Sequence, residues 1–342
     1  MSRRISILML LLVITTWLPA KTNWLAKFNS DIIYDRNIFC LSPSDLDRYR
    51  QRIEPERFPY RSADDLKLML NAELTGRFSK STSLIAGLRI YSYAVNQEKS
   101  YGLLRCKLEQ GIGSSSRLAF YSTWLPDYLI RYYRTPNNSQ FRPCRFGEWL
   151  AGADYEQRFR TLRIIPGYRF EFYNYIPPFE YYNTRAHRFD ARLDCRPERN
   201  LNLQTRYYFK IAQAKGPVPD ISYNEHDLFV KIATRPRRLN RFGIKSGYEY
   251  SYRSYTTDNP PAVDPAHANR VDRIQCISLG ADYELELFTI YFQYEFEWRD
   301  VQSPYKQQIE EIKEYRTTRV GLGVTLRLRM QLQGSEAQGG EE

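Results

Sequence analysis

Few residues in this chain have the types and spacing that catalysis or metal binding requires. Its three histidines, His187, His226 and His267, lie far apart, and no HExxH, CxxC, Walker or nucleophile-elbow pattern accompanies them. A hydrolase would need a serine activated by a histidine base, and three scattered histidines make a poor zinc site. We therefore expect no enzymatic activity, no metal and no cofactor.

The five cysteines are an odd number, which leaves at least one thiol unpaired. Cys106 and Cys195 fall at apolar positions of expected strands, and Cys276 falls on the opposite face of its strand. Cys40 and Cys144 lie in expected loops, where a disulfide could join them. The alternative is that the cysteines are mostly small unpaired hydrophobic residues, and the sequence leaves this question open.

The charged residues have a more informative spacing. Between residues 66 and 78, every second position from Leu66 is apolar or small, whereas Lys67, Glu73 and Arg77 lie at positions between them. A helix would scatter these two sets around its circumference, but a strand separates them onto two faces. The same alternation recurs along most of the chain, which predicts many strands that are apolar on one face only.

The polar faces of these strands offer electrostatic chemistry, because their side chains can pair across strands or attract ions. If these strands close into a barrel, the polar faces surround its lumen. Our candidate lumen-lining residues are Lys67, Glu73, Arg77, Arg89, Arg105, Lys107, Glu109, Arg163, Arg169, Arg188, Arg192, Arg206, Lys231, Lys245, Glu295 and Arg327. Further charges on the same faces are Asp154, Glu156, Glu171, Asp190, Asp194, Lys210, Asp227, Glu249, Glu297, Arg319 and Arg329. Bases outnumber acids in this set, so a water-filled lumen built from it would favour anions.

The elements that position these charges are about fourteen strands. Thirteen are clear from the alternation, and a weaker pattern over Asn29–Phe39 supplies another. A closed up-and-down barrel of this kind has an even number of strands, so twelve is the alternative. Short polar links at 79–83, 113–117, 157–161, 196–200, 235–240 and 284–286 alternate with mostly longer links at 40–65, 96–100, 126–145, 174–186, 213–225, 253–270 and 300–316.

Two of the longer links contain helix-like patterns. Ser44 to Asp47 resembles a capping box, and Tyr305 to Tyr315 places Ile309 and Ile312 on one face of a helical turn. We interpret both as ordinary loop structure rather than a mobile gate or plug.

The first twenty residues have the features of a cleaved signal peptide. Arg3 and Arg4 precede an apolar run that is too short to span a membrane, and Leu18-Pro19-Ala20 offers a cleavage site. Beyond it, no stretch approaches the length of a membrane helix, and mean hydropathy is −0.59 although the chain has 28 Tyr and 18 Phe. The predicted organisation is a signal peptide at 1–20, a barrel at 21–332 and a polar tail at 333–342.

Three arguments place the apolar faces against lipid. A barrel of so many strands has a lumen too wide to fill with Ala, Leu and Val. The opposite orientation would put many Lys and Arg side chains into hydrocarbon, at roughly 2–4 kcal/mol each near the midplane. Aromatic residues also gather at strand ends, as an interfacial girdle requires, for example Tyr173, Tyr175, Tyr252, Tyr255 and Trp298.

In this pattern the chain resembles bacterial outer-membrane β-barrel proteins over its whole mature length, without a diagnostic motif. The opening Tyr34-Asp35-Arg36-Asn37-Ile38-Phe39 is similar to the first strand of several such families. The resemblance implies an antiparallel transmembrane barrel with short periplasmic turns and long extracellular loops. It implies outer-membrane lipid and the barrel-assembly machinery as partners, although this chain continues past Met330 where such barrels often end on an aromatic residue.

Our leading functional hypothesis is a passive diffusion channel, or porin, for small hydrophilic solutes with a mild anion preference, in the outer membrane of a Gram-negative bacterium. We favour a monomer, and because the formal charge of +11 is spread over all strands, we expect no nucleic-acid partner. A non-conducting barrel whose extracellular loops bind a cell-envelope or surface partner is the alternative. A lipid-modifying barrel enzyme would require a Ser–His pair on the outer wall, for which His187 is the candidate base.

Overall fold

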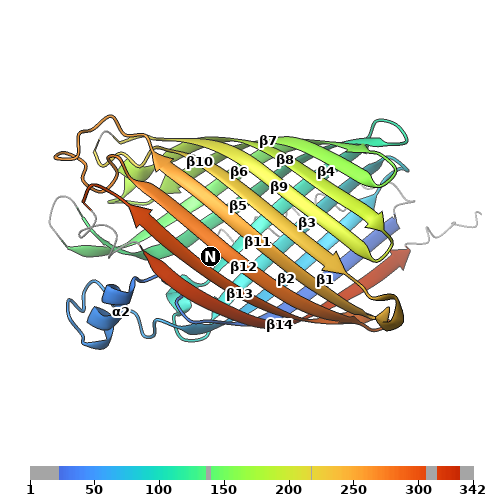
Figure 1. The fold of residues 1–342 in the computed structure, drawn as a ribbon, viewed down its shortest axis with the longest axis horizontal. Helices are drawn as coiled ribbons and strands as arrows, with labels where there is room; N and C mark the ends of the chain where they lie inside the picture. The colour runs from blue at the N-terminus through green and yellow to red at the C-terminus, as the bar shows by residue number, and fades with distance from the viewer. Residues whose placement is uncertain (1–22, 136–139, 217, 306–313, 332–342) are drawn as a thin grey trace, which may run out of the picture.

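The alternating segments fold into one closed antiparallel barrel of fourteen strands, each paired with its sequence neighbours, with β1 closing the barrel on β14 (Figure 1). The computed structural model describes residues 23–135, 140–216, 218–305 and 314–331. The expected signal peptide, the polar tail and most of the expected helix at 305–315 lie outside these residues. The prediction of fourteen strands is confirmed, and the alternative of twelve is excluded.

The strands are β1 (Asn23–Asp35), β2 (Asp65–Arg77), β3 (Thr82–Tyr93), β4 (Tyr101–Gly111), β5 (Ser116–Arg134), β6 (Phe141–Arg158), β7 (Leu162–Tyr175), β8 (Thr184–Glu198), β9 (Leu201–Ala214), β10 (Tyr223–Thr234), β11 (Phe242–Tyr255), β12 (Val271–Glu284), β13 (Phe288–Gln302) and β14 (Tyr315–Gln331). The helices are α2 (Pro43–Arg50) and the 3-10 turns η1 (Gln97–Lys99), η2 (Glu180–Tyr182) and η3 (Arg237–Leu239). Among the helices of the described residues, none has the length and apolarity needed to cross a bilayer.

Two expected boundaries are wrong. The first strand starts at Asn23 and ends at Asp35, so Ile38 and Phe39 belong to the following loop. The expected long link at 126–145 is mostly a protruding hairpin of β5 and β6, with register irregularities near Leu125 and Leu129. These irregularities shift the phase of the alternation, which made the hairpin look like a loop.

Long and short connections separate to opposite ends of the barrel. The longer segments, including 36–64 and 256–270, lie at the end where α2 projects, and shorter turns such as 199–200 and 285–287 lie at the other end (Figure 1). Helix α2 begins after Ser42, whose hydroxyl accepts a hydrogen bond from the backbone N–H of Asp45 at 3.1 Å. The expected asymmetry of the links is therefore present.

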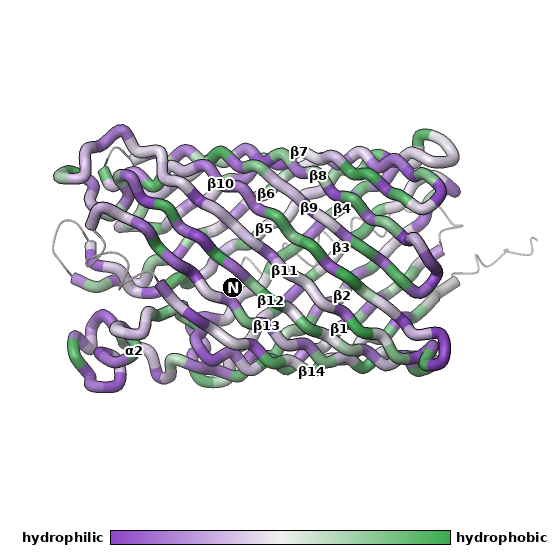
Figure 2. The backbone as a smooth tube through the Cα atoms, in the orientation of Figure 1, coloured by the Kyte–Doolittle hydropathy of each residue, from purple (hydrophilic) through white to green (hydrophobic). Residues whose placement is uncertain are grey.

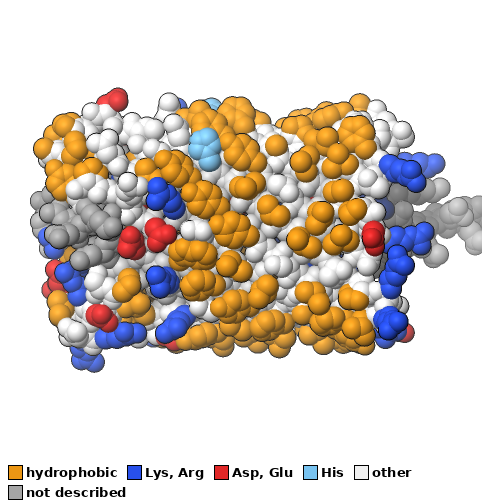
Figure 3. Space-filling model, viewed as in Figure 1, with side chains coloured by type: hydrophobic (Ala, Val, Ile, Leu, Met, Phe, Trp, Pro, Cys, Tyr) orange, Lys and Arg blue, Asp and Glu red, His pale blue; other side chains and the backbone are white. Residues whose placement is uncertain are grey.

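The convex wall of the barrel is apolar. Along the strands apolar and polar residues alternate (Figure 2), and hydrophobic side chains cover the middle of the wall, with most charges nearer its two ends (Figure 3). Phe28, Leu70, Phe189 and Leu322 illustrate this face, with exposed fractions of 45%, 45%, 51% and 59%. So much exposed apolar area is unfavourable in water and suits contact with hydrocarbon.

Candidate functional site

Contacts between strands that are not neighbours identify the concave face of the barrel. Arg206 of β9 lies 2.7 Å from Glu249 of β11, and Lys210 of β9 lies 2.6 Å from Glu171 of β7. Side chains converge inside a barrel and diverge outside it, so contacts across an intervening strand mark the inside. By strand parity, the other charged residues that share these faces also point inward.

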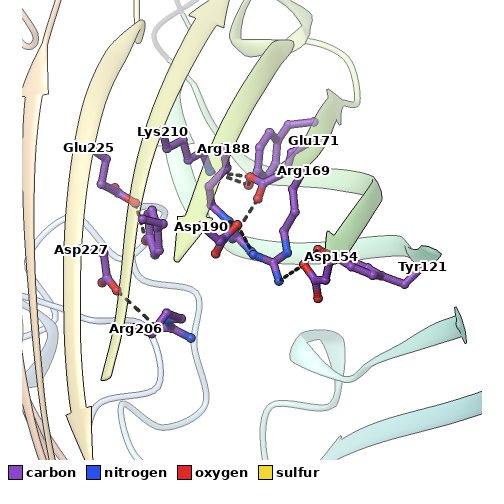
Figure 4. Close-up of polar contacts among 12 residues, drawn as sticks. Tyr121, Asp154, Arg169, Glu171, Arg188, Asp190, Arg206, Lys210, Glu225 and Asp227 are labelled. Carbon is purple, nitrogen blue, oxygen red and sulfur yellow. Dashed lines mark hydrogen bonds and ion pairs between the residues drawn. The ribbon is translucent and has the colours of Figure 1, made fainter. Parts of the chain in front are cut away.

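One ion-pair network lies on the inner wall formed by β6 to β9 (Figure 4). Arg169 pairs with Asp190 and lies 3.6 Å from Asp154. Arg188 pairs with Glu171 at 2.9 Å and with Asp190 at 3.2 Å. Each of these cations shares carboxylates with a neighbouring strand, so the network joins several strands and stiffens this part of the wall.

The remaining predicted residues divide into paired and unpaired groups. Those in ion pairs include Lys107 with Glu109, Arg163 and Arg192 with Asp194, Lys245 with Asp282, Arg319 with Glu295 and Glu297, and Arg206 with Asp227. Within the described part of the chain, the residues without an ion pair are Lys67, Glu73, Arg77, Arg89, Arg105, Lys231 and Arg327. Five of these residues, Lys67, Glu73, Arg77, Arg89 and Arg105, lie on the adjacent strands β2 to β4, and four of the five are bases.

Side chains do not fill the lumen at the positions of several charged residues. The exposed fractions of the Arg206, Glu249 and Lys245 side chains are 37%, 38% and 44% although all three point inward. Arg105 is also exposed on this face. These charges retain access to water, which reduces the desolvation cost of keeping them inside the barrel.

A cavity of about 330 Å³ lies at the end of the lumen that carries the long connections. Its cationic lining residues are Arg131, Lys210, Arg253, Arg270 and Arg299. The sequence prediction included Lys210 but placed Arg131, Arg253 and Arg270 in or at the ends of loops. The alternation of β11 around Glu249 offered the signal for Arg253, whereas the irregular register of β5 hid Arg131.

Tyrosines form much of the rest of the cavity lining. Tyr173, Tyr175 and Tyr255 belong to this set, so their expected place in a lipid-facing girdle is wrong. Lys210 of β9 donates to the Tyr173 hydroxyl at 2.9 Å across the intervening strand β8, a contact that only the inner face allows. A position near a strand end does not determine the face of a residue, whereas strand parity puts Tyr173 on the face of Glu171.

The long β1–β2 segment (residues 36–64) packs against the mouth of the barrel. Asn37 donates from Nδ2 to the carbonyl of Arg316 in β14 at 3.2 Å, and Tyr60 accepts a hydrogen bond from the N–H of Tyr132 in β5 at 3.3 Å. A hydrophobic core that includes Phe39 covers the junction. The segment thus bridges β14 and β5 at the rim of the barrel.

Each of the three histidines contacts a polar side chain. His187 and His226 lie near the outer wall, where their Nδ1 atoms are 2.7 and 2.8 Å from the hydroxyls of Tyr168 and Tyr207. His267 lies 2.8 Å from Asp264 in the β11–β12 loop. No group of three potential metal ligands is found among the described residues.

Cys40 has a free thiol, so the possible disulfide with Cys144 is not formed. Burial in the β1–β2 segment raises the pKa of the Cys40 thiol. The thiol is therefore a poor nucleophile at neutral pH and packs as a small hydrophobic group.

Comparison with known proteins finds similarity of architecture only. No protein-family model and no curated protein sequence matches the chain. Solved structures that are similar include the anion-selective porin from Comamonas acidovorans, with 7% sequence identity, coverage of 90% of this chain and 99% of that chain, and a TM-score of 0.48. The outer membrane channel DcaP of Acinetobacter baumannii has 9% identity, covers 90% of this chain and 97% of its own, and has a TM-score of 0.49. OmpT, an outer membrane protein of Vibrio cholerae, gives 9% identity, 91% and 98% coverage and a TM-score of 0.46. At this level of similarity no activity or solute carries over to this chain.

Proposed function

We propose that this protein is a passive diffusion channel for small hydrophilic solutes, with a mild preference for anions, in the outer membrane of a Gram-negative bacterium. The observation that carries the proposal is the combination of an apolar convex wall with an inner wall of charged side chains, such as Lys245 and Arg105, that remain exposed. A barrel with lipid outside and exposed charges inside can hold a continuous column of water.

The proposed anion preference rests on the bases that lack an acidic partner. Lys67, Arg89 and Arg105 belong to adjacent strands β2 to β4, and none has an ion pair within the described ranges. Paired charges cancel at a distance, but these three add a positive potential along one side of the lumen. The potential attracts anions and is weakened by salt.

The membrane arrangement forms part of the same proposal. The short turns would face the periplasm and the long connections the cell exterior, as in barrels of this class. The partners would be outer-membrane lipid and, during insertion, the barrel-assembly machinery. We propose a monomer, because strand pairing closes the barrel within a single chain.

One observation favours a second function, a non-conducting barrel whose extracellular loops bind a cell-envelope or surface partner. The β1–β2 segment is anchored on both β14 and β5 at the mouth, through Asn37 and Tyr60. If this segment and the ion pairs between strands seal the lumen, the loops become the only surface available for function.

Swelling of liposomes that contain the refolded barrel distinguishes the two functions. The wild-type barrel should admit small neutral sugars and should admit an organic anion faster than a cation of similar size. Arg105→Glu should lower the anion-to-cation permeability ratio by about twofold or more, because it reverses an exposed charge on the lumen wall. The matched control is Arg48→Glu in α2, outside the lumen, where the ratio should not change.

Two results would count against the proposal. Correctly inserted barrels that never support swelling would support the second function. Swelling with the same ion preference in wild type and Arg105→Glu would show that the lumen bases do not set selectivity.

A further inference from the structure

The cavity at the mouth has the size and lining of a ligand site. Its volume of about 330 Å³ lies at the lower end of the range of small-molecule pockets. Residues of β5 to β11 and of β13 contribute to it, together with Tyr182 of η2, Ile221 of the β9–β10 loop, and His267 and Arg270 of the β11–β12 loop. The site therefore lies where a solute entering from the long-loop end would first meet the inner wall.

The charges around the cavity are arranged in two layers. Arg253, Arg270 and Arg299 line the cavity, and none of the lining residues is a carboxylate. The acids that pair with these arginines, Glu225 and Asp272, lie behind them with exposed fractions of 4% and 0%. The surface presented to a ligand is therefore cationic, and the acids behind it hold the guanidinium groups in place.

One lining guanidinium group, that of Arg131, has unused capacity for an anion. Arg131 is only 8% exposed and makes no ion pair within the described residues, although its Nε donates to the hydroxyl of Tyr133 at 3.1 Å. A buried cation without a carboxylate is costly, so an anionic ligand would be stabilised here.

Aromatic rings form the other part of the lining. Tyr175 and Tyr182 meet edge to face with centroids 5.6 Å apart, and Tyr223 and Tyr255 lie 6.1 Å apart. The Arg253 guanidinium lies over the ring of Tyr223 at 4.2 Å. Ring surfaces next to guanidinium groups can contact a flat apolar ring while the cations bind its charged substituent.

We propose that this cavity binds a small organic anion that combines a carboxylate with a planar ring, an aromatic carboxylate. The proposal deepens the proposed channel function by naming a solute class, but the binding step needs no conduction. A carboxylate matches the planar fork of a guanidinium in a bidentate pair. The ring component distinguishes this ligand from inorganic phosphate and from a sugar acid, which would use the cations alone.

Isothermal titration calorimetry of the refolded full mature chain in detergent tests the proposal, with benzoate as the probe. Benzamide keeps the ring and removes the charge, cyclohexanecarboxylate keeps the charge and removes the planarity, and inorganic phosphate is an anion without a ring. We expect benzoate to bind about tenfold more tightly than benzamide. We also expect it to bind at least about threefold more tightly than cyclohexanecarboxylate or phosphate.

Two variants assign the binding to the cavity. Arg131→Gln should weaken benzoate binding about tenfold or more, and Tyr182→Leu should weaken benzoate more than cyclohexanecarboxylate. Tyr182→Leu alters a residue outside the strands, so it keeps the test valid if Arg131→Gln does not fold. The matched control is Lys80→Gln in the exposed β2–β3 turn at the other end of the barrel, which should leave benzoate binding unchanged.

The proposal would be overturned if benzamide matched benzoate, if phosphate matched benzoate, or if neither cavity variant altered benzoate binding. Equal binding of benzoate and cyclohexanecarboxylate would overturn the claim that a planar ring contributes to binding. Failure of the binding proposal is distinct from failure of the channel proposal. A barrel that binds benzoate but does not conduct would support the binding site and contradict the channel. A barrel that conducts but does not bind benzoate would support the channel and contradict the binding site.

Discussion

The side chain of Lys99 illustrates how the mouth of the barrel controls the charge of a single residue. Its Nζ donates to the carbonyls of Leu129 and Ile130, each at 2.8 Å, and faces the rings of Phe39 and Tyr128 at 5.0 and 4.7 Å. Burial lowers the pKa of Lys99 from 10.5 to about 7. A neutral amine retains two N–H donors, enough for both carbonyls.

We predict that the loops at the mouth become more stable as the pH rises above about 7. The unfolded loop keeps its proton up to the ordinary pKa of 10.5, whereas the folded loop releases it near 7. The unfolded state therefore binds more protons in this window, and stability rises with pH. Hydrogen-exchange protection factors at Arg61 and Ser62, whose amides bond to Asn96 beside η1, measure the effect.

Lys99→Met should remove this pH dependence, because methionine keeps the apolar stem and has no titrating group. Between about pH 7 and 9 the wild-type protection factor should rise relative to this variant, by up to about tenfold per pH unit. Lys80→Met, in the exposed β2–β3 turn, is the control and should behave as wild type. Parallel profiles in wild type and Lys99→Met would contradict the role assigned to Lys99.

At this scale the sequence predicted the side of the wall for charged residues better than for tyrosines. Period-two alternation fixed the face of Arg169 and Arg206 because charge contrasts strongly with their apolar neighbours. Tyr173 and Tyr255 have both polar and apolar character, so their presence at strand ends was compatible with lipid or lumen. Only strand register and the contact with Lys210 decide the position of Tyr173.

At the scale of elements, the β1–β2 segment is a small packing unit of its own. Phe39 stacks on Tyr60 with ring centroids 3.6 Å apart, and both belong to a core with Phe58, Tyr93 and Leu129. Tyr93 and Leu129 come from β3 and β5, so the core joins the segment to the barrel wall. Burial of these aromatic rings, rather than the short helix α2, accounts for the stability of the segment.

Phe39→Ala should loosen this segment and leave the barrel closed. Removing a buried phenylalanine costs about 3–5 kcal/mol, which for local opening corresponds to an increase of more than about a hundredfold in the open population. Limited trypsin digestion of the arginine-rich stretch 48–57 measures the opening. Ile53→Ala is the control, since its side chain is already 46% exposed. Equal cleavage rates in wild type and Phe39→Ala would show that the core does not hold the segment.

The arrangement of strands was more predictable than the packing of this segment. Strands with regular alternation, such as β2 and β13, were found because each residue reports its face independently. The β5–β6 hairpin and the β1–β2 core depend on bulges and on contacts between residues far apart in sequence, such as Phe39 with Leu129. Local periodicity carries no information about such contacts.

At the scale of the whole molecule, barrel closure satisfies the backbone and separates two environments. Every strand is paired on both sides, so the barrel has no open edge. Apolar residues such as Leu70 then face outward, and charged residues such as Lys67 face a lumen that water can enter. This separation explains why a chain with mean hydropathy of −0.59 can present an apolar wall.

The measurement that tests the central claim most directly is the single-channel conductance of the refolded mature chain in a planar bilayer, with a salt gradient to read ion selectivity. A water-filled lumen with an excess of unpaired bases predicts stepwise openings and a reversal potential of the sign expected for anion preference. A barrel that inserts correctly, shown by heat-modifiable mobility on a gel, and yet never conducts would contradict the account.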